Sequence, residues 1–278
     1  MLKRFPVKTD ARGRALLNLA CGTRTDANWN NVDFSHYALL RHHDFAVRVL
    51  RKLGLVSDQR YVRLQAIDRD VIRWNLTRGI PFDDNTYDVV YHSHFLEHLD
   101  RQAAFSCLRE CYRVLKPGGI LRVVVPDLEL LVQWYRESLG ELDRGNLDAE
   151  SRHERAIHDL FDQMVRTVSS GTAEQKPWVR RIERLIRGNA ATTGENHRWM
   201  YDRHSLGRLL TQIGFTAVHE QRATTSAIAG WENCFLDYDP GGKAYKPESL
   251  YLEAVKAVRV PDTRPSEVAQ KDAAEVTA

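Results

Sequence analysis

The sequence lacks the features that mark several classes of protein. No apolar run among its 278 residues approaches the length of a membrane span, and residues 1–14 contain no apolar segment of the kind found in signal peptides. The four cysteines show neither paired metal-ligand spacing nor the density of a disulfide framework, which fits a reducing compartment. We therefore expect a cytoplasmic protein without a membrane span.

An excess of charge of one sign is also missing. Lysine and arginine total 40 against 37 acidic residues, so the formal net charge is only +3. This balance gives no broad electrostatic footprint for nucleic acid, and no nucleic-acid partner is expected. Hydrophobic residues at 43% and charged residues at 28% lie close to globular averages, which excludes a disordered chain or a fibre.

Motifs that cradle phosphate groups are absent as well. The chain has no G-x-G-x-x-G and no Gly-Lys-Ser/Thr, so a pyrophosphate site for NAD or ATP is poorly supported. A cofactor without phosphates fits the sequence better. The chain also has no Asn/Asp-Pro-Pro-aromatic motif of the kind used by enzymes that act on bases of nucleic acids, and the run that follows residue 91 is His92-Ser93-His94-Phe95.

Short apolar runs alternate with helical patterns along most of the chain, which indicates an α/β fold with a mostly parallel, doubly wound sheet. The runs expected as strands are 15–20, 31–33, 88–92, 120–126, 216–220 and 250–255. Helices are expected over 39–53, 104–115 and 206–213, each ending at a Gly or Pro signal. Asp33 comes only eleven positions after Gly22, so the first crossover should be abbreviated and contain no full helix.

The alternation divides the chain into a sheet-forming core and an insertion. We expect an irregular extension over 1–14, the core over 15–127, a helical insertion over 128–196, the rest of the core sheet over 197–258 and a disordered tail over 259–278. The insertion carries amphipathic patterns over 157–168 and 178–186, and it follows a strand end. Ligands of open α/β sheets bind beyond the carboxyl ends of the strands, so the insertion is predicted to act as a substrate lid.

The first predicted strand runs into a turn of small residues, Ala20-Cys21-Gly22-Thr23, where a backbone can approach a ligand closely. The second predicted strand ends at Asp33. An acidic side chain at that tip can accept two hydrogen bonds from a ribose diol, although a carboxylate at a strand end can also be a simple cap. Taken alone, the two features are compatible with a cofactor site but are not specific for one.

Two longer motifs carry a specific resemblance. The run from Asn75 to His98, with Ile80-Pro81-Phe82-Asp83 and Asp88-Val89-Val90 inside it, and the later Leu115-Lys116-Pro117-Gly118-Gly119 resemble methyltransferases of the type 11 group. These belong to the class I S-adenosylmethionine-dependent methyltransferases. With the turn after residue 19, Asp33 and the run 249–253, the resemblance covers the sheet-forming parts of residues 15–256.

The resemblance implies a Rossmann-like sheet of seven strands with the last strand antiparallel, and S-adenosylmethionine as the methyl donor. It implies that the donor's methionine end lies over the turn at Ala20, that Asp33 holds the ribose, and that Asn75 borders the adenine. The full set of cofactor-binding candidates is Ala20, Cys21, Gly22, Asp33, Phe34, Asn75, Leu76, Ser93 and His94. The sequence departs from the family pattern in having one glycine in the first turn and Asn75 where an Asp is usual.

His92, His94, Glu97 and His98 form the densest ionisable cluster. A helix starting at residues 95–96 would break the shared strand face of His92 and His94, and no second acidic group has ligand spacing, so no metal is expected. His94 is the candidate general base, since imidazole titrates near neutrality, and a structural histidine is the alternative.

Asp127, His197 and Tyr201 are the candidate substrate contacts, because they lie at the fifth strand's tip and between the insertion and the late helix. Helix capping by Asp127 and packing of Tyr201 are the alternatives. The acceptor is expected to be a small molecule or a sugar. A nucleotide-sugar or polyamine enzyme and a catalytically degenerate scaffold on the same fold are the rival interpretations.

Overall fold

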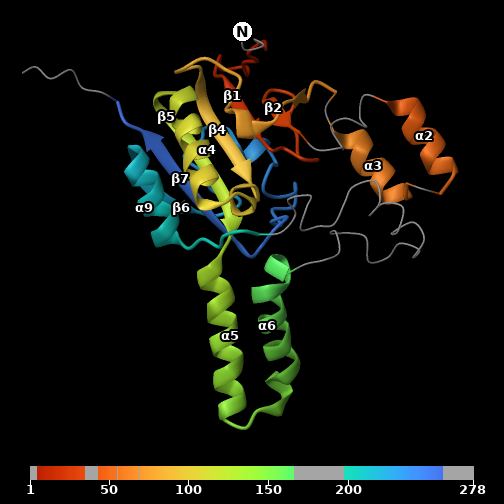
Figure 1. Cartoon of the computed structure of the whole chain (residues 1–278), viewed down its shortest axis with the longest axis vertical. Coiled ribbons are helices and arrows are strands. Elements are labelled where there is room, and N and C mark those ends of the chain that lie inside the picture. The colour runs from red at the N-terminus through yellow and green to blue at the C-terminus, as the bar shows by residue number, and fades with distance from the viewer. Residues whose placement is uncertain (1–4, 35–42, 55, 68, 166–196, 259–278) are drawn as a thin grey trace, which may run out of the picture.

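The structure, a computed structural model, describes residues 5–34, 43–54, 56–67, 69–165 and 197–258. Its centre is one sheet of seven strands in the order β3-β2-β1-β4-β5-β7-β6 (Figure 1). The strands are β1 (Leu16–Leu19), β2 (Asn30–Asp33), β3 (Ile72–Arg73), β4 (Tyr87–Ser93), β5 (Leu115–Pro126), β6 (Phe215–Gln221) and β7 (Ser249–Lys256). All six predicted strands are present, and the two-residue β3 is the addition.

Strand directions follow the expectation. β1 pairs in parallel with β2 and β4, β2 with β3, and β4 with β5. β7 lies between β5 and β6 and is antiparallel to both. The predicted Rossmann-like sheet with an antiparallel last strand is therefore confirmed, and the carboxyl ends of β1, β2 and β4 lie at one edge.

The central strands are buried on both faces, as parallel strands require. Leu17 and Leu19 of β1 face a cluster completed by the helices α4 (Arg101–Val114) and α9 (Arg203–Ile213). Leu16 points to the opposite face, which is covered by Trp29 and side chains of the 223–238 segment. One face thus lies under helices and the other under a long connection.

α4 and α9 agree with the predicted helices 104–115 and 206–213, and side chains cap both of them. Asp100 accepts a hydrogen bond from Ala103 N at the start of α4, and Asp202 forms a reciprocal capping box with Ser205 at the start of α9. α4 ends at Val114 rather than Leu115, so the Pro117-Gly118-Gly119 run lies within β5. A Cβ added at Gly119 would lie 2.9 Å from the Lys116 carbonyl oxygen, which explains glycine there.

The first crossover is abbreviated, as predicted, because residues 20–29 form turns and contain no helix. Two helices follow β2 instead, α2 (Asp44–Lys52) and α3 (Asp58–Ala66), and they lie beyond the β2–β3 side of the sheet (Figure 1). α2 is the described part of the predicted helix 39–53, whose first residues lie outside the described ranges.

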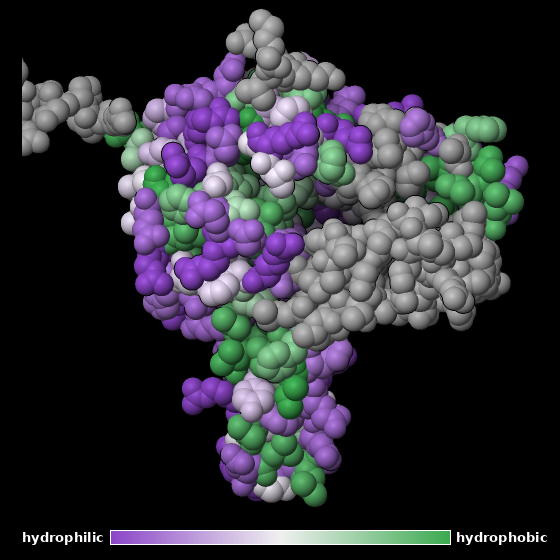
Figure 2. Space-filling view, in the orientation of Figure 1, coloured by the Kyte–Doolittle hydropathy of each residue, from purple (hydrophilic) through white to green (hydrophobic). Residues whose placement is uncertain are grey.

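The insertion after β5 begins as an arm of two helices. α5 (Leu128–Asp143) and α6 (Glu150–Val165) lie side by side and extend away from the sheet (Figure 1). Apolar patches alternate with hydrophilic ones on the arm (Figure 2), and Leu147 and Phe161 are exposed there. α6 overlaps the predicted pattern 157–168; the pattern 178–186 lies outside the described residues. Among the described helices, none combines the length and apolarity that crossing a membrane requires.

Candidate functional site

The turns after β1 and β4 hold unusual backbone conformations at the same edge of the sheet. Ala20 and His94 have φ values of 50° and 49°, and Gly22 has a φ of 53°. Left-handed conformations of non-glycine residues cost about 1–3 kcal/mol and persist where the surrounding structure holds them, typically at functional sites. The left-handed residues in these two turns therefore mark this edge as a candidate site.

Asp33 joins the tip of β2 to the turn after β1. Its Oδ2 atom accepts a hydrogen bond of 2.7 Å from the Gly22 backbone N, and the residue is only 6% exposed. This charge-assisted bond links the second strand to the glycine turn and fixes the path of its backbone. Two of the predicted cofactor-binding residues thus act as one unit.

A cavity of about 690 Å³ opens beside these turns. Its lining includes five of the predicted cofactor-binding residues, namely Ala20, Cys21, Gly22, Ser93 and His94. The volume lies within the range of about 300–1,000 Å³ found for small-molecule sites. The candidates that follow β1 and those at the end of β4 therefore line the same cavity.

The remaining four cofactor candidates, Asp33, Phe34, Asn75 and Leu76, lie at the neighbouring β2–β3 edge and do not line this cavity. Phe34 is 53% exposed, with the Arg73 guanidinium 4.9 Å from its ring centroid. Asn75 caps a short 3-10 turn, η1 (Leu76–Arg78), where its Oδ1 accepts from the backbone N of Thr77. Trp74 N donates to the Asp33 carbonyl oxygen at 3.2 Å, so this edge adjoins the tip of β2.

The connection between β6 and β7 supplies cavity residues that the sequence analysis missed. Leu236, Asp237, Tyr245 and Lys246 all line the cavity. The signal in the sequence is the connection's length, because a stretch from 222 to 248 without a predicted element is far longer than ordinary loops and suggests a functional one.

A buried ionic network holds this connection against the sheet. Arg122 of β5 donates from Nε to Asp237 Oδ2 at 2.9 Å and from Nη1 to Glu253 Oε1 at 2.7 Å. It also donates to three backbone carbonyls of the connection, and Tyr91 O–H donates to Asp237 Oδ1 at 2.6 Å. Burial raises the pKa of Asp237, and Arg122 opposes that rise. The network positions Asp237 at the cavity wall.

The His94 ring is held on both sides. Its Nε2 lies 2.8 Å from Ser249 Oγ, and its Nδ1 lies 3.2 Å from Glu97 Oε1. Burial lowers the pKa of His94, while the Glu97 carboxylate acts in the opposite direction. Next to it, burial lowers the pKa of His92 to about 4, so His92 is neutral at pH 7.

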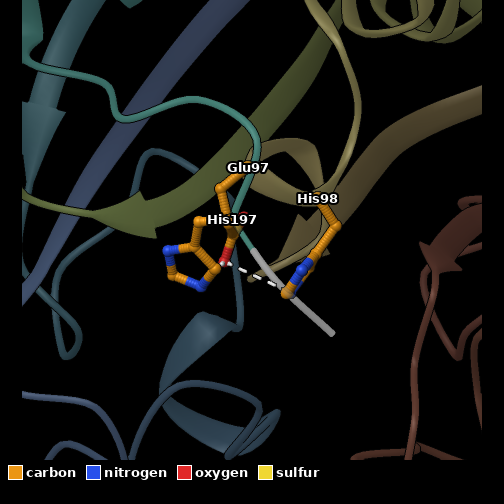
Figure 3. A group of neighbouring side chains, drawn as sticks. All are labelled: Glu97, His98 and His197. Atoms are coloured by element: carbon orange, nitrogen blue, oxygen red, sulfur yellow. Dashed lines mark ion pairs between the residues drawn. The ribbon is translucent and has the colours of Figure 1, made fainter. Parts of the chain in front are cut away.

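Glu97 and His98 lie on η2 (Leu96–His98), a 3-10 turn, and α4 begins only at Arg101. The predicted helix start at residues 95–96 agrees with the start of this 3-10 turn, whose N-cap is Phe95, and the α-helix itself begins after Asp100. Figure 3 shows His98 and His197 on either side of the Glu97 carboxylate, each with its Nε2 atom 3.9 Å from Glu97 Oε1. Burial lowers the pKa of His197 to about 4.

Two of the three substrate candidates lie together away from the cavity. Asp127 caps α5 by accepting from the backbone N of Glu129 at 2.9 Å, and it forms a parallel bridge with Tyr201. Tyr201 is 3% exposed within the core, and burial raises its pKa to about 12. Neither residue lines the 690 Å³ cavity, and His197 lies beside Glu97 instead.

Similarity to known proteins is found in the part of the chain that contains β1 to β4 and most of β5. Residues 17–123 match the family described as a methyltransferase domain. The chain is 33% identical over 132 residues to the ubiquinone/menaquinone biosynthesis C-methyltransferase UbiE of Enterobacter sp. (strain 638), covering 44% of this chain and 47% of that protein. It is 35% identical over 98 residues to the demethylmenaquinone methyltransferase of Lactiplantibacillus plantarum, covering 33% and 39% respectively.

The chain spans about half the length of these curated relatives, 47% for the UbiE protein. Among solved structures, a SAM-dependent methyltransferase from Archaeoglobus fulgidus aligns with 14% identity and a TM-score of 0.40, covering 87% of this chain and 85% of that one. At that level of similarity it adds nothing to the fold assignment, which rests on the strand order.

Proposed function

Because residues 17–123 match the methyltransferase domain family, we propose that the chain is a class I S-adenosylmethionine-dependent methyltransferase that transfers a methyl group to a small-molecule or sugar acceptor. The observation that carries the proposal is the bond between Asp33 Oδ2 and Gly22 N beside the cavity at the ends of β1 and β4. It joins a carboxylate suited to a ribose diol to a turn suited to close backbone approach.

The residues present fit this donor. A Cβ added at Gly22 would meet no atom within 4 Å, so the space above the turn is open to a ligand. A donor without phosphates does not need the glycine-rich nest that binds anions, so one glycine in the turn is sufficient. Asn75, at the edge next to Asp33, offers an amide of the kind that can border an adenine.

S-adenosylmethionine, when bound, supplies an electrophilic methyl group on a sulfonium centre. The chain's part is then to hold the acceptor in line with that group and to exclude water, which can supply much of the rate enhancement. Ser93 and His94 are proposed to border the donor's methionine end, since both line the cavity at the tip of β4. His94 is also the candidate proton acceptor for a hydroxyl or amine substrate.

The printed names of the relatives support a small organic acceptor, since they refer to ubiquinone, menaquinone and demethylmenaquinone. One of those names specifies methylation at carbon, so a carbon acceptor is a second candidate beside oxygen and nitrogen. The rival proposal, a degenerate scaffold, predicts donor binding without turnover.

The test is a transfer assay with a methyl-labelled donor and pools of small phenols, quinols and sugars. We expect label in a small-molecule product. Asp33→Asn should raise the KM for the donor by roughly ten- to a hundredfold, because losing a charged hydrogen bond costs about 1.5–3 kcal/mol. Asp143→Asn, at the far end of α5, should leave the donor KM unchanged.

Two other outcomes contradict parts of the proposal. Donor binding without transfer to any pool would favour the degenerate scaffold. An unchanged donor KM in Asp33→Asn would show that Asp33 does not contact the ribose.

A further inference from the structure

Unsatisfied polar atoms gather at one place in the described part of the chain. Six buried side-chain nitrogen and oxygen atoms there lack a hydrogen-bond partner, and they belong to His92, Glu97, His197 and Tyr201. Both carboxylate oxygens of Glu97 are among them, although this residue is fully buried. Native proteins satisfy the large majority of buried polar groups, so such a concentration calls for further partners, such as ordered water or an ion.

Three donor atoms converge at this place. Glu97 Oε1 lies 3.9 Å from His98 Nε2 and 3.9 Å from His197 Nε2, and the three ligand atoms all lie within 4.8 Å of one another (Figure 3). In a tetrahedral site with bonds of about 2.1 Å, neighbouring donors are about 3.4 Å apart. Small rotations of two imidazole rings would therefore complete the coordination geometry.

We propose that Glu97, His98 and His197 bind a divalent transition-metal ion of the zinc type. Two imidazoles and one carboxylate are a donor set that such ions prefer, whereas Mg²⁺ and Ca²⁺ select oxygen-rich sites. Three protein ligands leave a coordination position for water or another oxygen. The ion would also balance the charge of the buried Glu97 carboxylate, whose Oε1 atom lies 3.2 Å from His94 Nδ1.

The surrounding backbone preorganises the ligands. Glu97 and His98 are neighbours on η2, and the Glu97 carbonyl oxygen accepts hydrogen bonds from Arg198 N at 2.7 Å and Trp199 N at 3.3 Å. These two bonds hold the segment carrying His197 against the turn that carries the other two ligands. Bound metal would thus tie the chain before the insertion to the chain after it.

His94 is a positioning residue in this arrangement. Its Nδ1 lies 3.2 Å from Glu97 Oε1, and Ser249 Oγ fixes the other ring nitrogen at 2.8 Å. Ligating carboxylates and histidines are commonly oriented by such outer contacts. Since His94 also lines the 690 Å³ cavity, the ion would lie next to the proposed methyl-transfer site. Metal binding itself does not depend on the proposed function.

The test uses the full chain, stripped with a chelator and titrated with Co²⁺ while its visible absorption is recorded. We expect one equivalent of Co²⁺ to bind, Zn²⁺ to displace it, and Mg²⁺ in excess to leave the spectrum unchanged. Zn²⁺ should also raise the Tm of the stripped protein. Absence of a Co²⁺ spectrum and of any Tm shift would overturn the proposal, as would displacement by Mg²⁺.

The Co²⁺ affinity of variants at the three proposed ligands shows where the ion binds. Glu97→Gln and His197→Gln should each lower Co²⁺ affinity more than tenfold, since even outer contacts of metal sites are worth about 10- to 100-fold. His98→Gln, at a half-buried position, is the variant expected to fold best, and circular dichroism checks all three. His219→Gln, at an exposed histidine of β6, should bind like the wild type. Equal affinity in all four variants would place the ion elsewhere and overturn the proposal.

Discussion

At the scale of single residues, Gly22 has a backbone role and a role in access to the cavity, and comparison with a control glycine separates the two. The φ of 53° at Gly22 favours glycine for backbone reasons, and the open space above it favours glycine for access to the cavity. Gly13 offers a matched control, because it has a φ of 75° and also meets nothing within 4 Å of an added Cβ. It lies in a turn that does not line the cavity.

Gly22→Ala and Gly13→Ala should therefore each lower the free energy of unfolding by about 1–2 kcal/mol, the usual cost of a left-handed alanine. Only Gly22→Ala should also weaken binding of S-adenosylmethionine. Urea denaturation measures the first effect and calorimetry the second. Equal binding by the two variants would mean that the turn after β1 does not contact the donor.

The site residues that sequence analysis identified are those fixed by local position. Ala20 and His94 directly follow strands and Asp33 ends one, and parallel strands bring their carboxyl ends to one edge whatever the loops do. The approach of His197 to Glu97 could not be foreseen in this way. It depends on how the chain returns from the insertion, and the bonds to the Glu97 carbonyl that fix it come from backbone atoms, which leave no sequence signal.

At the scale of elements, Arg122 connects β5, β7 and the long connection between β6 and β7. Its side chain is fully buried, and its two ion-pair partners, Asp237 and Glu253, are also buried. The guanidinium carbon lies 4.3 Å from the Trp231 ring centroid as well. Removing one member of such a network leaves the other charges buried without compensation.

Arg122→Ala should accordingly lower the free energy of unfolding by about 3–5 kcal/mol, measured by urea denaturation. Arg109→Ala, at an exposed position of α4, should change it by less than about 0.5 kcal/mol. A loss at Arg122 as small as the control's would show that the network does not hold the connection in place.

Two of the elements that sequence analysis missed, β3 and α5, are hidden by their length or by their neighbours in the chain. β3 has two residues, too few for alternation to be visible, and it becomes a strand only through pairing with β2. α5 begins at Leu128, with one residue between it and the end of β5 at Pro126, so its first apolar residues read as a continuation of the apolar sequence of β5. α4 and α9 were predictable because their buried side chains recur with helical spacing and their ends carry caps.

At the scale of the whole molecule, one edge of the sheet carries every feature proposed to function. The glycine turn, Asp33 and the 690 Å³ cavity lie at the ends of β1, β2 and β4, and Glu97 with its two histidines lies directly after β4. The arm of α5 and α6 leaves the same end of the sheet, after β5 (Figure 1). The fold thus gathers the proposed donor and metal sites at the strand ends, where open α/β sheets bind their ligands.

We propose that S-adenosylmethionine binds at the carboxyl ends of β1, β2 and β4. Calorimetric titration of the full-length protein with S-adenosylmethionine, and with S-adenosylhomocysteine as the non-reactive analogue, tests it most directly. We expect saturable binding of one equivalent of each ligand, weakened by Asp33→Ala. A folded protein that binds neither ligand at concentrations up to about 1 mM, where even an affinity of about 4 kcal/mol would be detected, would contradict it.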